Sequence, residues 1–299
     1  MNDAHHHSGE HNRAFAIGVA LNLGFVGIEA AFGVVAGSLA LVADAGHNLG
    51  DVLGLLLAWG ATYLARLRPT IRRTYGWRSS SILAALLNAV ILLVAVGGIA
   101  TEAIRRLQEP EPVSSGTVIV VAAVGIAINA ATALLFMKGR RRDLNIRGAF
   151  LHMVADAGVS AGVVVAGLGI LVTDWAWLDP FVSLIIAGVI LLGTWGLLRD
   201  SVNLALHAVP EGIDPERVRS YLCSLPGVMA VHDLHIWAMS TTETALTAHL
   251  VKPELANDDA LISQATNELY ERFGIEHTTL QWERQGPSGP CVTCCDGHG

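Results

Sequence analysis

The stretch Asp44-Ala45-Gly46-His47-Asn48-Leu49-Gly50-Asp51 lies within an apolar segment, Leu39–Ala65, that is long enough to cross a membrane as a helix. Residues four apart lie on one face of a helix, so His47 and Asp51 are predicted to reach a common point. The same HxxxD spacing returns in a later apolar segment as His152-Met153-Val154-Ala155-Asp156. Ionisable side chains are costly to place in hydrocarbon, so this recurrence indicates a functional site.

Two imidazoles and two carboxylates make a complete tetrahedral ligand set for a divalent ion such as Zn²⁺. The two carboxylates also balance the charge of the ion and so reduce the cost of burying it. The alternative is that each pair makes only structural hydrogen bonds between helices. The repeated spacing favours the metal site, with the ligands His47, Asp51, His152 and Asp156.

The composition is that of an integral membrane protein. Of the 299 residues, 52% are hydrophobic and only 15% are charged, whereas soluble domains carry about 25% charged residues. Apolar runs long enough to span about 30 Å of hydrocarbon occur six times along the chain. We therefore expect six transmembrane helices, at Ala14–Ala36, Leu39–Ala65, Ile82–Leu107, Val113–Met137, Ala149–Val172 and Trp177–Leu198.

Basic residues are concentrated in two of the connections between these helices. Residues 66–78 hold five arginines and residues 138–147 hold five lysines and arginines, whereas Gly37-Ser38 and Thr173–Leu178 hold none. Arg105 and Arg106 are exceptions near another connection. Because cytoplasmic loops carry the excess of basic residues, both termini are predicted to be cytoplasmic. No sorting signal is apparent in the sequence, which favours a bacterial inner membrane.

After residue 206 the sequence becomes that of a small α+β domain. Asp214-Pro215 predicts a helix start, and this helix is expected to reach Leu225. Strands are expected at 228–238, 243–251 and 275–283, with an amphipathic helix at Asp258–Phe273. This αββαβ order is that of a compact domain. The predicted division is a His-containing tail at 1–13, a six-helix membrane domain at 14–206, the α+β domain at 207–285 and a Cys-containing tail at 286–299.

Further metal-ligand residues occur outside the membrane segments. His232 and His249 fall on neighbouring predicted strands and can share an ion, although a histidine is often an ordinary surface or core residue. Cys291 and Cys294 form a C-x-x-C pair, which supplies half of a structural zinc site and needs partners from elsewhere. The remaining candidate ligands are His235, His277 and Glu283 in the α+β domain and His5, His6 and His7 in the N-terminal tail. Alternatively, the tails only raise the local zinc concentration.

The chemistry of the ligands indicates how transport is coupled. Metal ions and protons compete for the same imidazole and carboxylate groups, so alternating access predicts export of a metal ion in exchange for protons. The sequence lacks HExxH, P-loop and G-x-S-x-G motifs, so neither an enzyme nor an ATP-driven pump is predicted. The net charge of −7 gives no reason to expect nucleic-acid binding.

These residues resemble those of the cation diffusion facilitator family, nearest its zinc-transporting branch. Besides HNLGD and HMVAD, the segments Arg73-Thr74-Tyr75-Gly76-Trp77-Arg78 and His232-Asp233-Leu234-His235-Ile236-Trp237 are typical of the family. The resemblance implies a homodimer in the membrane lipid, zinc/proton antiport out of the cytoplasm, and a ferredoxin-like C-terminal domain that dimerises and binds zinc. It also implies the same four transport ligands, and His47 favours zinc because members with Asp there are associated with wider metal use.

Departures from the family pattern qualify these expectations. Residues 66–78 offer only arginines where some bacterial members carry a second metal site, so that site is predicted to be absent. Gln281 stands where such members have a histidine, which leaves at least one zinc of the α+β domain without a ligand. Cys291 and Cys294 resemble the terminal C-x-x-C of some vesicular zinc transporters. The function predicted is Zn²⁺/H⁺ antiport, and the alternatives are an exporter of Co²⁺, Ni²⁺, Fe²⁺ or Cd²⁺ and a membrane-anchored zinc sensor.

Overall fold

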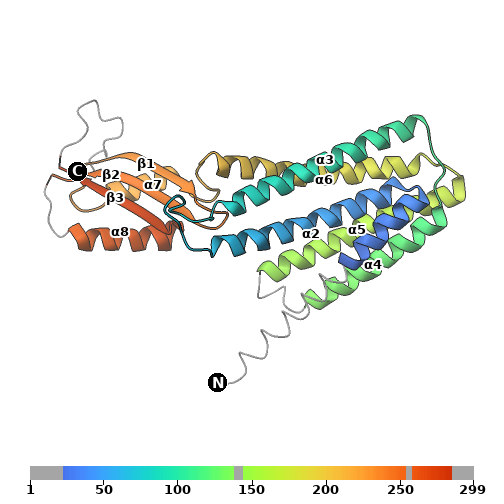
Figure 1. Ribbon diagram of the computed structural model, residues 1–299, viewed down its shortest axis with the longest axis horizontal. Coiled ribbons are helices and arrows are strands. Elements are labelled where there is room, and N and C mark those ends of the chain that lie inside the picture. Colours follow the sequence, from blue (N-terminus) through green and yellow to red (C-terminus); the bar gives the residue numbers. More distant parts are fainter. Residues whose placement is uncertain (1–22, 138–143, 254–257, 285–299) are drawn as a thin grey trace, which may run out of the picture. The chain divides into compact units, whose positions relative to one another are not determined.

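The computed structural model describes residues 23–137, 144–253 and 258–284 (Figure 1). The chain forms two compact units. The first runs to Leu56 and resumes at Leu87–Gly196, and the second comprises Leu57–Leu86 and the residues from Leu197 onward. The tails and the loop 138–143 lie outside the described residues, and so do the predicted tail ligands His5, His6, His7, Cys291 and Cys294.

Five described helices are long and apolar enough to cross a membrane. A further apolar helix comprises Leu23–Ala36, and the residues before it are not described. Helices suit this environment because each satisfies its backbone hydrogen bonds internally, where lipid offers none. The expected polytopic helical architecture is therefore confirmed. The five long helices are α2 (Leu39–Ala65), α3 (Ser80–Gln108), α4 (Ser115–Met137), α5 (Leu144–Thr173) and α6 (Leu178–Ala205).

Three of these helices, α3, α5 and α6, exceed their predicted bounds, and the differences are largest in α5 and α6. α6 continues to Ala205 rather than ending at Leu198, and α5 begins at Leu144 rather than Ala149. Both extensions contain charged or polar residues, for example Arg199 and Asp200 in α6. An apolar run marks the part of a helix that suits hydrocarbon, whereas the backbone hydrogen bonds continue into the polar flank.

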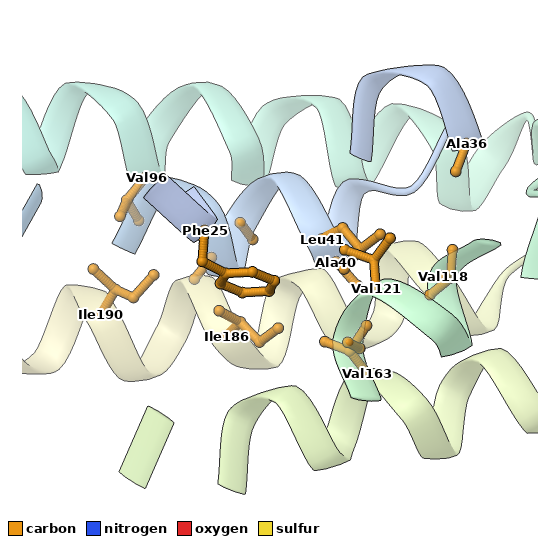
Figure 2. Packing of buried hydrophobic residues seen from close by; sticks show 13 residues of the cluster. Phe25, Ala36, Ala40, Leu41, Val96, Val118, Val121, Val163, Ile186 and Ile190 are labelled. Carbon is orange, nitrogen blue, oxygen red and sulfur yellow. The ribbon is translucent and has the colours of Figure 1, made fainter. Parts of the chain in front are cut away.

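The core of the first unit consists of small and branched side chains from several helices. Figure 2 shows Phe25 and Leu41 with Val163 of α5 and Ile186 of α6, all of which are buried. A side chain at Gly125 of α4 would place its Cβ 3.0 Å from the Phe25 ring, which is tighter than an ordinary contact, so this close approach favours glycine. Because lipid is as apolar as the side chains, such packing between small residues holds the helices together.

The connection before α2 is fixed at both of its ends. Gly37 adopts a φ of 69°, and the Ser38 N–H donates to the Gly33 carbonyl at 2.9 Å, which is a Schellman helix end. The buried Asp179 carboxylate of α6 then accepts the Leu39 N–H at 2.6 Å and the Ser38 hydroxyl. Asp179 thus caps α2 from another helix, where the positive end of the helix dipole favours a carboxylate.

We expect Asp179→Ala to destabilise the protein by about 1–3 kcal/mol, because the buried N–H and O–H donors would lose their charged acceptor. Thermal unfolding in detergent measures this effect. Glu109→Ala is the control, since this exposed carboxylate on the surface should change stability by less than about 0.5 kcal/mol. Equal unfolding temperatures for the two variants would contradict a stabilising role for the cap.

The second unit contains the predicted αββαβ domain. Its elements are α7 (Pro215–Cys223), β1 (Ala230–Ala238), β2 (Thr244–Val251), α8 (Asp258–Phe273) and β3 (His277–Glu283). The Asp214 side chain accepts the Glu216 N–H at 3.0 Å, as expected for an N-cap. The sheet order is β1-β2-β3, with β1 and β2 antiparallel and β2 and β3 parallel. The predicted α+β fold is confirmed.

The two faces of this sheet have different roles. Leu246 and Leu250 of β2 pack in one buried cluster with Leu222 of α7 and Leu269 of α8. Because successive side chains of a strand point to opposite faces, His249 lies on the face away from this cluster. The register pairs His249 with His232 on β1 and with Gln281 on β3. The sheet therefore gathers polar side chains on its second face.

Candidate metal sites

The first cluster joins α2 and α5 within the first unit. His47 lies 3.7 Å from Asp51 through Nδ1 and 3.7 Å from Asp156 through Nε2. His152 Nε2 lies 3.2 Å from Asp51 Oδ2 and 3.6 Å from Asp156 Oδ2. Each imidazole therefore contacts both carboxylates, one on its own helix and one on the other. The two HxxxD pairs predicted from the sequence meet in space.

These distances suit a tetrahedral metal ion. With Zn–N and Zn–O bonds of about 2.0–2.2 Å, neighbouring ligand atoms around zinc lie about 3.3–3.6 Å apart. The nitrogen–oxygen separations of the cluster are 3.2–3.7 Å. His47 meets the two carboxylates through different nitrogens, so its ring must rotate for one nitrogen to face an ion held by the other three residues. The two imidazoles lie edge to face, with ring centroids 6.0 Å apart.

The cluster is buried at one end and accessible at the other. The Asp156 side chain is 2% exposed, whereas His152 is 42% exposed. The oxygens Asp51 Oδ2 and Asp156 Oδ2 are buried and have no hydrogen bond of suitable geometry within the described residues. Their lone pairs are available to a cation.

Polar residues continue from this cluster into the bundle. Asp44 is buried and accepts a hydrogen bond of 2.8 Å from Ser160 on α5. Asp44 lies seven residues, or about two turns, before Asp51, which places the two on roughly the same face of α2. Ser160 was not identified from the sequence, although its spacing of four residues from Asp156 places it on the same face of α5.

A second cluster lies on the outer face of the sheet in the second unit. Glu283 accepts hydrogen bonds from His232 at 2.9 Å and from His249 at 2.8 Å. These three residues each offer a ligand atom within 4.8 Å of the others. The Gln281 amide donates to Glu283 at 3.3 Å from the strand position opposite His249. The donor set fits a divalent metal ion, with Gln281 at the edge of the site.

The electrostatics of Glu283 follow from these contacts. Partial desolvation acts to raise the pKa of its carboxyl group, but the hydrogen bonds from His249 and His232 outweigh this effect and lower the pKa below its ordinary value. The group is therefore ionised at neutral pH, as a metal ligand must be.

Two predicted ligands of this domain lie elsewhere. His235 pairs with Thr247 beyond an irregularity in β1 and is exposed. His277 lies against the Arg78 guanidinium, which also donates to Glu243 at 2.9 Å. Within the described residues, neither histidine belongs to the group formed by His232, His249 and Glu283.

Comparisons with known proteins agree with this architecture. The family model for the cation efflux transmembrane domain matches residues 15–204, and the model for the cytoplasmic domain of cation efflux proteins matches residues 210–285. The zinc transporter ZitB of Escherichia coli (strain K12) is 37% identical over 300 residues, which cover 97% of this chain and 95% of ZitB.

Two further proteins resemble the chain. The cadmium, cobalt and zinc/H(+)-K(+) antiporter of Bacillus subtilis (strain 168) is 32% identical over 298 residues, which cover 97% of this chain and 94% of that protein. The solved metal-bound C-terminal domain of the CzcD transporter from Cuprividus metallidurans is 33% identical and covers 24% of this chain and 99% of that domain, with a TM-score of 0.22. That score is too low to support a structural argument.

The matches span both domains and include proteins named as metal transporters rather than enzymes. The membrane-spanning helices and the α+β domain have the architecture that these two family models describe. The chain belongs to the cation efflux, or cation diffusion facilitator, family and is an integral membrane metal transporter.

Proposed function

We propose that this protein is a Zn²⁺/H⁺ antiporter that exports zinc from the cytoplasm through His47, Asp51, His152 and Asp156. The observation that carries this proposal is the closed arrangement of two imidazoles and two carboxylates, with neighbouring nitrogen and oxygen atoms 3.2–3.7 Å apart. The family membership supports transport, and the ligand geometry supports this position for the transported ion.

Exchange with protons follows from the ligand chemistry. Zinc binds neutral imidazoles and ionised carboxylates, so its binding displaces any protons that these groups carry. When the site opens to the other side of the membrane, protons from that side compete with zinc for the same atoms and release it. Both termini lie in the cytoplasm in this scheme, as the distribution of basic residues predicts.

The ligand set favours zinc without excluding similar ions. Two nitrogens and two carboxylate oxygens suit Zn²⁺ in tetrahedral geometry and also accept Co²⁺, Ni²⁺ or Fe²⁺. The Bacillus subtilis relative is named for cadmium and cobalt as well as zinc. Zinc is proposed as the main substrate because ZitB is named as a zinc transporter and His47 contributes a second imidazole.

We expect Asp51→Asn and Asp156→Asn each to reduce zinc flux in proteoliposomes by at least about 100-fold, because each removes a charged ligand from the site. Zinc uptake is followed with an indicator trapped in the vesicles while a pH gradient is imposed. Glu109→Gln makes the same chemical change at an exposed position and should leave flux unchanged.

Two results would contradict this proposal. Flux in the wild type that does not respond to the pH gradient would contradict proton antiport. Normal flux in both Asp variants would instead leave the two HxxxD pairs as structural contacts between α2 and α5.

We further propose that His232, His249 and Glu283 bind zinc on the α+β domain. The face that holds them is stabilised by the sheet register, so the ligands are positioned before a metal arrives. The Gln281 amide lies beside them but is a poor zinc ligand compared with imidazole. The site therefore has three strong ligands and an incomplete fourth position.

We expect Gln281→His to raise the zinc affinity of this domain by about tenfold or more, because an imidazole would complete a tetrahedral set. Zinc competition with a chelating dye measures this in the full chain that also carries Asp51→Asn, which removes the membrane site from the titration. Asn267→His on exposed α8 is the control and should have no effect. Equal affinities for the two variants would argue against a metal site next to Gln281.

A homodimer is the proposed assembly, since the matched family model of the cytoplasmic domain carries dimerisation in its name. The chain has a mass of 31.6 kDa, so light scattering in detergent should give a protein mass twice that value. Deletion of residues 207–299 should lower the mass of the particle to that of one truncated chain. A wild type that is monomeric at all concentrations would refute the assembly.

A further inference from the structure

The connection between α2 and α3 carries a concentration of positive charge. Residues 66–79 hold five arginines, and no aspartate or glutamate occurs between Asp51 and Glu102. The chain as a whole has the opposite balance, with 26 acidic residues against 19 lysines and arginines. These arginines therefore have no acidic neighbour in the sequence, and any partner must come from elsewhere.

Only one of the five arginines finds a carboxylate. Arg78 donates to Glu243 at 2.9 Å. The other four are exposed and form no ion pair within the described residues: Arg66, Arg68, Arg72 and Arg73. The guanidinium carbon of Arg73 lies 3.8 Å from the centroid of the Trp77 ring, a contact that positions the cation without neutralising it. Elsewhere the chain pairs most of its described arginines with carboxylates, as at Arg105, Arg106, Arg199 and Arg272.

Backbone hydrogen bonds give this connection a defined shape. Thr70 and Arg73 exchange two backbone hydrogen bonds of 3.0 Å, and Thr70 Oγ1 also accepts the Arg73 N–H at 3.1 Å. Ile71 and Arg72 lie at the tip of this turn, and Ile71 is 99% exposed. A second turn follows, in which Gly76 with a φ of 71° donates to the Arg73 carbonyl at 2.9 Å. Because the backbone is already ordered, binding an anion here costs less conformational entropy.

The last turns of α2 place the start of the connection at the membrane surface. Trp59 and Tyr63 lie four residues apart on one face of the helix and are 74% and 64% exposed. Exposed tryptophan and tyrosine side chains of membrane helices favour the level of the lipid headgroups. Arg66 follows Tyr63 by three residues, which is less than one helical turn. The arginines therefore begin at the depth of the lipid phosphates.

We propose that the connection between α2 and α3 binds the phosphate groups of anionic phospholipids through Arg66, Arg68 and Arg72. A guanidinium group donates parallel hydrogen bonds to phosphate oxygens and keeps its charge at any physiological pH. The exposed Ile71 beside Arg72 adds an apolar contact with the lipid below the headgroups. A free phosphate ion offers no partner for this side chain, so the lipid is the source of phosphate that fits the surface.

This binding goes beyond the orientation of the chain in the membrane. An excess of lysine and arginine is enough to keep a short connection on the cytoplasmic side, and no fixed conformation is required for that. The hydrogen-bonded turn and the exposed Ile71 at its tip are features that orientation does not need. A surface that recognises a headgroup uses both.

Lipid titration of the full chain tests the site. The protein in neutral detergent is titrated with phosphatidylglycerol or with phosphatidylcholine, and native mass spectrometry measures the lipid bound. We expect the wild type to bind phosphatidylglycerol at least about tenfold more tightly than phosphatidylcholine. The double variant Arg68→Gln, Arg72→Gln should lose most of this difference, because each arginine at an anionic surface strengthens binding by about fivefold.

A second double variant provides the control. Arg217→Gln with Arg272→Gln removes the same charge from exposed positions of α7 and α8 and should bind both lipids as the wild type does. Thermal unfolding without added lipid shows whether each variant is folded. Should Arg68→Gln, Arg72→Gln fail to fold, Arg66→Gln alone decides, with an expected loss of about fivefold in affinity for phosphatidylglycerol.

Three results would overturn the proposal. The first is equal binding of the two lipids by the wild type, and the second is an unchanged preference in the Arg68→Gln, Arg72→Gln variant. The third is a preference that is lost equally in the control variant, which would show a response to overall charge. Inorganic phosphate should raise the unfolding temperature less than phosphatidylglycerol does at the same concentration, and an equal increase would contradict the assignment to lipid.

Discussion

The structure of the membrane domain depends on one constraint: an ionisable group at membrane depth must find its partners inside the bundle. Asp156 lies between two imidazoles, Asp179 accepts donors at the start of α2, and Asp44 accepts the Ser160 hydroxyl. Each of these buried groups has its partner on another helix, so it helps to fix the relative position of two helices. The contacts that would bind a metal ion are therefore also contacts that define the packing.

This constraint explains why the bundle combines close packing with a polar interior. Small side chains allow the helices to approach, as Gly125 does opposite Phe25. The polar residues of the interior include the partly exposed His152 and the buried Asp44 and Glu29. Burying the carboxylates costs free energy, and binding of a cation or a proton would offset part of that cost.

In the α+β domain the corresponding constraint is strand register. His232, His249 and Glu283 are widely separated in sequence, yet the antiparallel and parallel pairings bring them to one face of the sheet. A shift of one residue in either pairing would turn a ligand towards the leucine-rich core. The same register places Gln281 next to the three residues proposed to bind zinc, and a glutamine amide is a weaker zinc ligand than an imidazole.

Hydropathy and spacing by themselves determined the membrane helices, the αββαβ order and the internal geometry of each HxxxD pair, because these properties depend on residues close in sequence. The tertiary structure decided that α2 and α5 are neighbours, that Ser160 contacts Asp44, and that His235 and His277 lie apart from the cluster around Glu283. Apolar helix surfaces carry little information about which helices pair in lipid, and strand register depends on contacts across the whole sheet. Similarly, the ends of α5 and α6 lie beyond their apolar runs because backbone hydrogen bonding continues where hydrophobicity stops.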